Sequence, residues 1–448
     1  MSAAAKNLLF ISYFYPPLGG GGVQRVLQTT RLLPRFGWKP AVLTVDGGRW
    51  TSADDSGLSR IPPDVTVERT RYITAAGIKE KLFGRRRLPG TVATLPSDGY
   101  GAAPQTLRDR IVSRVRALWQ TPDEFIGWYP FAVKRGRGML ARSRFNAIVS
   151  SGPPWTAHLI ARRLALETGL PWLADFRDGW TLMPCNPHGN GWQYRIEERL
   201  ERGVLDRADA LVFTNPQTQQ DYVSRRKVDA RKTHTVTNGF DPEGFTGTVE
   251  VEKDFVLFYG GTTLGGQRLE RLFPALDRFH KRHPDEKVRI EYAGSEGPAL
   301  AAAAKAAGVE AMFRDLGYLP HAETVRKMRT SAALLLPMMS RDVSRSVYPG
   351  KLFEYLAAGR PVFYVGRDGA TTDLLRELGM TKFVIGEPGN ADVDRAVDEA
   401  LDELHAAFRT GGTRQPASVV MDIHARFSRV DLTRRFAGIL DEISSKRP

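Results

Sequence analysis

Lys351 and Glu354 stand three residues apart, after an apolar run at residues 334–336 that predicts a buried strand. Residues 351–358 have apolar side chains at helical spacing, so both charged residues fall in the first turn of a predicted helix. In a parallel sheet, ligands bind beyond the carboxyl ends of the strands, where helix N-termini point. A lysine there can neutralise a phosphate, and a glutamate can accept hydrogen bonds from a sugar diol. Taken alone, the pair is better explained as a solvated i, i+3 ion pair.

A run of four glycines, residues 19–22, lies between an apolar strand at 8–14 and a helical pattern at 23–36. A strand, a glycine-rich turn and a helix together bring backbone N–H groups close to a phosphate or a sugar. The run lacks the Gly-Lys-Ser/Thr ending of a P-loop and the glycine spacing of a dinucleotide fingerprint. A flexible turn and a ligand-binding loop therefore stay equally open here.

Charged residues also follow the predicted strand at 171–176, where Asp175, Arg177 and Asp178 stand together. The two carboxylates either pair with the arginine in a structural turn or face a substrate, and Asp178 is the better candidate for the second role. His158 lies inside a predicted helix at 156–168, which favours a packed residue over a catalytic one.

The elements that position these residues alternate between strands and helices in both halves of the chain. This rhythm predicts an α/β protein with two Rossmann-like, doubly wound parallel-sheet domains that face a cleft and join near residues 238–245. The predicted boundaries are 1–240, 241–425 and a C-terminal helix at 426–448. The predicted strands are 8–14, 40–46, 65–71, 147–152, 171–176, 210–214, 233–237, 255–259, 288–293, 334–336, 361–365 and 383–385.

Composition is that of a globular protein, with 42% hydrophobic and 25% charged residues among 448. A single cysteine, Cys185, excludes an internal disulfide and a cysteine-based zinc cluster, which fits a reducing cytosol. No run of about 18 apolar residues and no signal peptide is visible. We therefore expect a cytoplasmic protein, either free or peripheral on the inner face of the plasma membrane.

The net positive charge of the chain comes from its N-terminal half. Residues 1–240 hold 35 Lys+Arg and 20 Asp+Glu, a net +15, while residues 241–448 hold 29 and 30, a net −1, which sum to the overall +14. The basic half predicts an anionic surface or acceptor as a partner. No nucleic-acid recognition signature accompanies it, so we expect no nucleic-acid partner. A basic, partly apolar insertion at about 74–120 fits contact with an anionic membrane and fits a mobile surface loop equally well.

Seven segments together resemble the family 4 glycosyltransferases of GT-B fold, over nearly the whole chain. This family is retaining, uses nucleotide sugars and needs no catalytic metal or other cofactor. The subgroup that shares SGPP, DFRDxW and PxKLFEYLA includes bacterial enzymes of surface-polysaccharide and glycolipid assembly. The segments are YFYPPLGGGGVQR (13–25), SSGPPWTAHLIA (150–161), PWLADFRDGW (171–180), VTNGFDPEGF (236–245), FYGGTTLGG (258–266), LGYLPHAE (316–323) and YPGKLFEYLAAGRPV (348–362).

The resemblance implies roles for individual residues. Glu354 corresponds to the second glutamate of the family's E-x7-E signature, which holds the donor ribose, while Ser346 stands where the first glutamate is expected. Lys351 corresponds to the basic residue near the diphosphate, and Arg268 substitutes for the family's arginine after the first C-terminal strand. The implied catalytic residues are Arg177, Asp178 and Lys351. The implied donor-binding residues are Gly20, Gly21, Gly22, Gly261, Thr262, Arg268, Tyr318, Leu319, Ser346, Pro349, Gly350, Lys351 and Glu354.

The resemblance also implies an acceptor-binding N-terminal domain, a donor-binding C-terminal domain and a last helix that returns to the first domain. The expected reaction is transfer of a sugar from a nucleoside-diphosphate sugar to a hydroxyl of a glycan, a glycolipid or a small molecule. Two alternatives stay open: a nucleotide-sugar epimerase of the same fold, and a non-catalytic, membrane-recruited homologue.

Overall fold

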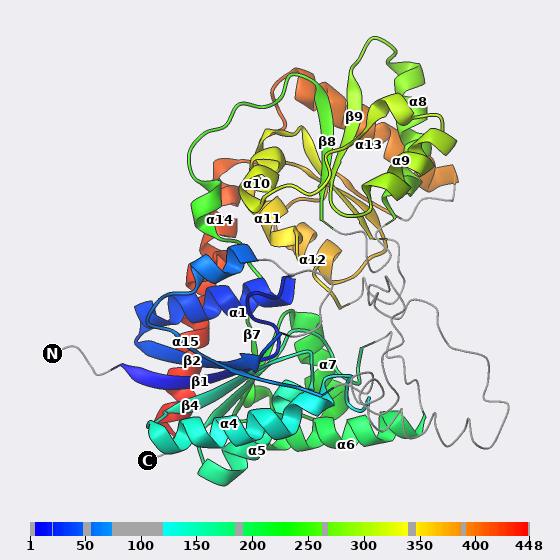
Figure 1. Ribbon diagram of the computed structural model, residues 1–448. Helices are drawn as coiled ribbons and strands as arrows, with labels where there is room; N and C mark the ends of the chain where they lie inside the picture. The colour runs from blue at the N-terminus through cyan, green and yellow to red at the C-terminus, as the bar shows by residue number, and fades with distance from the viewer. Residues whose placement is uncertain are drawn as a thin grey trace, which may run out of the picture. The chain divides into compact units, whose positions relative to one another are not determined.

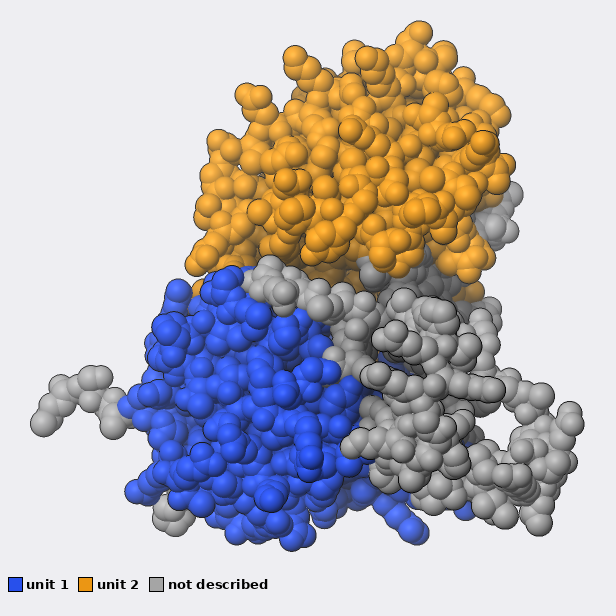
Figure 2. Space-filling model, in the orientation of Figure 1, with its two compact units in different colours: residues 1–236, 433–448 blue, residues 237–432 orange. Residues whose placement is uncertain are grey.

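The computed structural model describes residues 5–19, 21–47, 55–73, 120–183, 191–261, 268–338, 346–386 and 391–446. The chain divides into two compact units (Figures 1 and 2). Unit 1 contains residues 1–236 and 433–448, and unit 2 contains residues 237–432. The basic insertion predicted at about 74–120 lies almost entirely outside the described residues.

Unit 1 is built on a seven-stranded sheet in the order β3-β2-β1-β4-β5-β6-β7, in which every paired strand is parallel. The strands are β1 (Lys6–Ser12), β2 (Trp38–Val45), β3 (Thr66–Thr70), β4 (Ala147–Gly152), β5 (Trp172–Phe176), β6 (Ala210–Phe213) and β7 (Thr233–Thr235). The helices are α1 (Gly21–Leu32), η1 (Leu33–Phe36), η2 (Asp55–Arg60), η3 (Ile126–Trp128), α4 (Tyr129–Arg142), α5 (Thr156–Thr168), α6 (Trp192–Arg207), α7 (Pro216–Arg226) and η4 (Ala230–Lys232).

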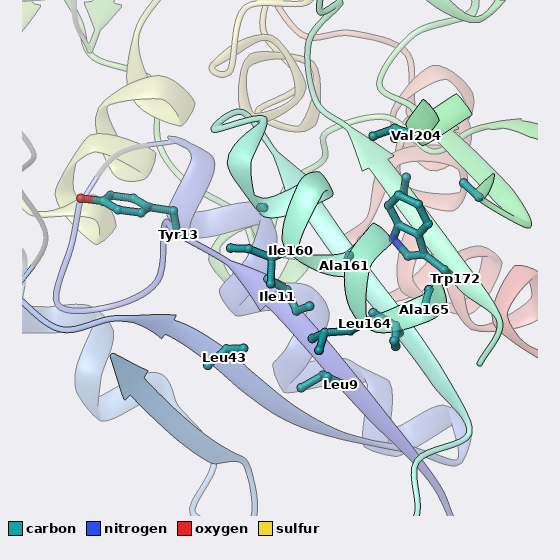
Figure 3. Packing of buried hydrophobic residues seen from close by; sticks show 14 of the residues in the cluster. Leu9, Ile11, Tyr13, Leu43, Ile160, Ala161, Leu164, Ala165, Trp172 and Val204 are labelled. Carbon is teal, nitrogen blue, oxygen red and sulfur yellow. The ribbon is translucent and has the colours of Figure 1, made fainter. Parts of the chain in front are cut away.

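Near-continuous apolar runs in the central strands explain why this sheet is covered on both faces. All residues of β4, β5 and β6 are buried. Figure 3 shows one face of this core, where Leu9 and Ile11 of β1 and Leu43 of β2 meet Ile160 and Leu164 of α5. Strand residues two apart point to the same face, so this alternation fixes which side chains α5 covers.

Unit 2 has a six-stranded parallel sheet in the order β10-β9-β8-β11-β12-β13. Its strands are β8 (Phe255–Gly260), β9 (Val288–Ala293), β10 (Phe313–Asp315), β11 (Ala333–Met338), β12 (Val362–Gly366) and β13 (Val384–Ile385). Its helices are η5 (Pro242–Phe245), η6 (Leu269–Leu272), α8 (Phe273–Arg282), α9 (Gly297–Ala306), η7 (Glu310–Met312), α10 (His321–Thr330), α11 (Leu352–Ala357), α12 (Ala370–Glu377), α13 (Ala391–Arg409) and α14 (Ala417–Phe427).

Two hydrophobic clusters cover the two faces of the unit 2 sheet. Leu257 of β8 and Leu335 of β11 belong to one cluster, while Phe258 and Leu334, their neighbours in sequence, belong to the other. This alternation is what a strand buried on both faces requires. The doubly wound, parallel α/β architecture expected from the sequence is therefore confirmed in both units.

The last helix, α15 (Arg429–Ser445), begins in unit 2 and continues into unit 1 at Thr433. In unit 1 its Asp441 accepts hydrogen bonds from Lys6 Nζ at 2.8 Å and from Trp38 Nε1 at 3.1 Å. The chain thus enters unit 2 once, after Val236, and leaves it through this helix.

In each sheet the strand order reverses at one point, between β1 and β4 in unit 1 and between β8 and β11 in unit 2. Ligands of open α/β sheets bind beyond the carboxyl ends of the strands at such a topological switch point. The glycine run follows β1, and the segment that leads to Lys351 follows β11. Both switch points therefore carry residues that the sequence singled out.

Candidate functional site

In unit 2, Lys351 reaches from the segment after β11 to the end of the neighbouring strand β8. Its Nζ lies 3.7 Å from the centre of the Tyr259 ring. A Cβ built on Gly261 would lie 3.5 Å from Lys351 Cε and Nζ, and Gly261 has φ +102°, which favours glycine. Bare backbone next to an ammonium group is a suitable lining for a phosphate.

The environment of Lys351 changes its acid–base behaviour. Burial lowers its pKa to about 7 from the ordinary 10.5, and Glu296 acts in the opposite direction. Glu296 is itself held in place, because Tyr292 Oη donates to its carboxylate and Ser295 Oγ donates at 2.9 Å. An arriving anion would replace the lost hydration of the ammonium and restore its charge.

Glu354 lies in α11, three residues after Lys351. Its carboxylate is 3.7 Å from His321 Nε2, and its side chain is 25% exposed. Burial raises the pKa of Glu354, while His321 and Arg429 oppose that rise. The next residue, Tyr355, accepts a hydrogen bond from the Gly260 N–H at 2.9 Å, which ties α11 to the end of β8. The carboxylate is thus held at the edge of the switch point with an exposed surface for a hydroxyl donor.

The segments after β10 and β11 carry several other predicted donor-binding residues. Tyr318 is 80% exposed, and Leu319 packs against the unit 2 core. Ser346 is partly buried, Gly350 is exposed, and the buried Pro349 accepts a hydrogen bond from the Leu352 N–H at 2.9 Å.

The remaining predicted donor residue in the described part of unit 2 is Arg268. It precedes η6 and pairs with Glu270 at 2.6 Å, with 58% of its side chain exposed. Gly20 and Thr262 lie outside the described residues. The sequence predicted no role for Tyr259, Glu296 and His321. Tyr259 stands directly before the Gly260-Gly261 pair, and Glu296 follows the predicted strand at 288–293, so both had a signal in the sequence.

In unit 1, Arg177 is packed between the first turn of α1 and the loop after β4. Its NH1 donates to Ser151 Oγ at 3.2 Å, its NH2 donates to the Pro153 carbonyl, and the guanidinium lies 5.5 Å from the Phe14 ring centre. A Cβ on Gly22 would come 3.2 Å from Arg177 NH2, so the glycine permits this approach. Burial lowers the pKa of Arg177 to about 10.

Asp175 pairs with Arg25 and not with Arg177, which stands two residues further along the chain. Its carboxylate accepts hydrogen bonds from Arg25 of α1 at 2.7 and 3.1 Å, and from Ser151 Oγ at 2.7 Å. Burial raises the pKa of Asp175, but Arg25 and Ser151 hold it below its ordinary value. Arg25 NH2 also donates to the Val236 carbonyl. This buried pair connects α1, β4, β5 and the end of the unit.

Asp178 is the more accessible carboxylate of the two. Burial raises its pKa, and Arg177 and Arg25 oppose the rise. Behind this loop the carboxylate of Glu201 accepts hydrogen bonds from Thr181 and from Tyr222 Oη, which in turn accepts from the Trp180 N–H at 2.8 Å. The loop that carries Arg177 and Asp178 is thus anchored from α6 and α7.

The unit 1 switch point therefore brings together Gly22, Arg177 and residues of the SGPP segment, and the unit 2 switch point brings together Gly261 and Lys351. Gly21 opens α1 directly before Gly22. Within the residues that the structure describes, no group of three or more His, Cys, Asp or Glu side chains is arranged to hold a metal ion.

Comparisons with known proteins agree with the fold of the two units. A sequence model of the glycosyl transferase 4-like domain matches residues 20–239. A search of curated proteins gave no significant match. Similar solved structures include a glycosyltransferase from Rickettsia africae ESF-5, with 11% identity and a TM-score of 0.62 over 99% of this chain and 100% of that chain.

Two further structures span both units. Sucrose-phosphate synthase from Thermosynechococcus elongatus has 14% identity and a TM-score of 0.63, over 98% of this chain and 100% of that chain. HepE from Anabaena in complex with UDP-glucose has 13% identity and a TM-score of 0.60, over the same shares. At these identities the structures show the fold alone, and the sequence model shows a glycosyl transferase 4-like domain over residues 20–239. The chain has the GT-B fold, and its residues 20–239 are similar to the glycosyl transferase 4-like domain.

Proposed function

We propose that the protein transfers a sugar, with retention of anomeric configuration, from a nucleoside-diphosphate sugar to a hydroxyl of a glycan, lipid-linked or small-molecule acceptor. The observation that carries the proposal is the position of Lys351, whose ammonium lies against the Gly261 backbone at the unit 2 switch point. The UDP-glucose in the HepE complex supports a uridine diphosphate sugar as the first donor to test.

On the donor side, Lys351 would neutralise the diphosphate as it leaves. Charge that develops on a leaving group is stabilised best by groups already fixed in position, and the contact with Tyr259 fixes this ammonium. Glu354 would accept hydrogen bonds from the ribose hydroxyls. Tyr318 and Leu319 would line the base, and Gly261, Ser346, Pro349 and Gly350 would line the phosphates and sugar.

On the acceptor side, Arg177 and Asp178 would orient the attacking hydroxyl, with Gly21 and Gly22 at the adjoining turn. In the proposed same-face displacement, the bond from C1 to the acceptor oxygen forms as the bond from C1 to the phosphate oxygen breaks. The acceptor proton passes to the leaving diphosphate. No protein nucleophile and no metal is used in this scheme.

The direct test incubates the purified protein with UDP-glucose, UDP-galactose and UDP-N-acetylglucosamine, with and without a panel of glycan and glycolipid acceptors. We expect acceptor-dependent release of UDP and an α-linked product by NMR, with unchanged rates in EDTA. Conversion of the donor sugar without an acceptor would instead support the epimerase. Nucleotide binding without turnover across the panel would support a non-catalytic homologue.

The cellular location is part of the proposal: the protein would act in the cytoplasm, where nucleotide sugars are available, or on the inner face of the plasma membrane. Among the described residues, no helix is long and apolar enough to cross a bilayer. The net charge of +15 over residues 1–240 supports attraction to an anionic surface or acceptor.

A further inference from the structure

Three arginines of unit 2, Arg329, Arg360 and Arg414, gather at the sheet edge opposite Lys351. Arg329 is in the last turn of α10, which leads into the amino end of β11, and Arg360 precedes the amino end of β12. Because β11 and β12 are parallel, both residues lie at the same, amino-terminal edge. Lys351 follows the carboxyl end of β11, so these three arginines, the arginine triad, are separate from the candidate donor site.

Hydrogen bonds from one side chain and from the backbone draw the triad together. Arg360 Nε donates to the Arg329 carbonyl at 2.8 Å. The N–H of Gln415, the residue after Arg414, donates to the Gly359 carbonyl at 3.0 Å, directly before Arg360. Three separate segments of the chain thus meet at this point.

A fourth segment, directly after η5, receives the other two guanidinium groups. Arg329 NH2 donates to the Gly247 carbonyl, and Arg414 NH2 donates to the Val249 carbonyl at 2.9 Å. The two carbonyls are two residues apart on one short stretch of chain. Arg329 and Arg414 are therefore held beside each other, and Arg329 is also in contact with Arg360.

The arginine triad concentrates positive charge in one place. Within the described part of the chain, no carboxylate pairs with any of the three arginines. The nearby Glu252 carboxylate accepts instead from Lys327 Nζ at 2.8 Å and from Thr330 Oγ1 at 3.1 Å. Like charges that are not compensated repel one another, so this arrangement is unfavourable unless an anion joins it.

The uncompensated charge is clearest at Arg360, which is only 2% exposed and whose NH1 has no hydrogen-bond partner among the described residues. Burial lowers the pKa of Arg360 to about 10, and Arg414 and Arg329 lower it further. A buried charge is costly unless it is paired and hydrogen-bonded. The neighbouring carbonyls occupy one nitrogen of each guanidinium, which has five N–H donors. Backbone carbonyls therefore account for only part of what these side chains can donate.

We propose that the arginine triad binds a tetrahedral oxyanion, either free phosphate or the phosphate group of a small phosphorylated molecule. Guanidinium groups donate paired hydrogen bonds to phosphate oxygens, and a phosphate has enough oxygens and charge for several of them at once. A carboxylate ligand would suit the triad less well than a phosphate, because it offers only two oxygens and one negative charge. The site is independent of the proposed transferase activity and of the donor pocket.

The test is calorimetric titration of the full-length protein with sodium phosphate and, separately, with glucose 1-phosphate, at constant ionic strength set with sodium chloride. The variants are Arg329→Gln and Arg414→Gln, neither of which truncates a fully buried side chain. Arg395→Gln on the exposed face of α13 is the matched control, and Lys351→Ala removes phosphate binding at the donor site. Circular dichroism melts check that each variant is folded.

We expect phosphate or glucose 1-phosphate affinity to fall about tenfold or more in each triad variant, and to stay within twofold of wild type in Arg395→Gln and Lys351→Ala. Binding of phosphate alone or of both ligands indicates a free-phosphate site, and binding of glucose 1-phosphate alone indicates a phosphorylated metabolite. The proposal is overturned if neither ligand binds, if folded triad variants bind as tightly as wild type, or if only Lys351→Ala loses binding.

Discussion

At the level of single residues, Lys351 combines an ammonium group, an aromatic ring beneath it and a glycine that leaves backbone exposed beside it. Each feature has a physical role: burial makes the charge costly in the free protein, and an incoming diphosphate removes that cost. Lys351 is therefore suited to bind the leaving group more strongly than a solvated lysine would.

The pH dependence of donor binding tests this role. Because the pKa of Lys351 is about 7, the free protein is neutral at this position above that pH, and a bound diphosphate takes up a proton there. We expect affinity for the donor to fall as pH rises above about 7 in wild type, and to lose this dependence in Lys351→Ala. Calorimetry in buffers of different ionisation enthalpy would count the protons. A pH-independent wild-type affinity would contradict the assignment.

The same lowered pKa affects stability with a definite sign. The unfolded chain keeps this proton up to the ordinary pKa of 10.5, whereas the native state releases it near 7. Between these values the unfolded state binds more protons, so the contribution of this group to stability rises with pH.

For catalysis, Lys351→Ala should lower kcat/KM by about 10²–10³-fold, while Lys351→Arg retains more activity.

The proposed role of Glu354 predicts a preference for ribose. Glu354→Gln should weaken binding of the ribonucleoside diphosphate about 10- to 100-fold, because a hydrogen bond to a charged acceptor is worth about 1.5–3 kcal/mol. It should leave the 2′,3′-dideoxynucleoside diphosphate, which lacks the diol, nearly unaffected. Glu399→Gln, an exposed residue of α13, is the control. If Glu354→Gln weakened binding of the two nucleoside diphosphates equally, Glu354 would not contact the ribose diol.

At the level of elements, α15 shows how one amphipathic helix completes unit 1. Its buried residues follow a spacing of three and four, with Phe436, Ile439, Leu440 and Ile443 all at most 8% exposed. The exposed Lys6–Asp441 pair adds little by comparison, because surface ion pairs are screened by water. Apolar burial is therefore the main contribution of this helix to stability.

Truncation of one core residue measures that contribution. Leu440 is fully buried, so Leu440→Ala should lower the free energy of unfolding by about 2–5 kcal/mol through lost burial and the cavity left behind. Arg435→Ala, on the exposed face of the same helix, should stay within about 0.5 kcal/mol. Urea unfolding followed by circular dichroism would compare the two variants. A loss below about 1 kcal/mol for Leu440→Ala would mean that α15 is only loosely packed.

At the level of the whole molecule, the uneven charge predicts where the protein meets anions. The net charge is +15 over residues 1–240 and −1 over residues 241–448. We expect the protein to sediment with vesicles that contain phosphatidylglycerol and not with phosphatidylcholine alone. The bound fraction should fall as salt rises from about 0.1 M to about 0.5 M, since the screening length shortens.

Charge reversal separates the predicted insertion from the rest of the basic half. The variant Arg85→Glu, Arg86→Glu, Arg87→Glu should lose most vesicle binding, whereas Lys305→Glu with Arg395→Glu in unit 2 should not. If the insertion variant binds as wild type does, the membrane contact lies elsewhere or the basic half serves a soluble anionic acceptor. Retention on neutral vesicles at high salt would argue against an electrostatic surface altogether.

The sequence was sufficient for the alternation of apolar strands and helices, because buried parallel strands need continuous apolar runs that stand out in the chain. It missed β10, which has only three residues, and α4, whose two glycines and four basic residues weaken the helical pattern. The predicted helix at 351–358 became the shorter α11, Leu352–Ala357, with Lys351 at its N-cap. Short or irregular elements depend on tertiary packing more than on their own residues.

By itself, the sequence determined the residue types at the ends of the strands, because local spacing reveals where each strand stops. Which of those ends are neighbours was decided only by the tertiary structure. Lys351 meets Gly261 because β8 and β11 are paired across a long stretch of chain. Asp175 pairs with Arg25, 150 residues away, and not with Arg177, two residues along the chain. Strand order follows from the burial of the whole sheet, and no local spacing encodes it.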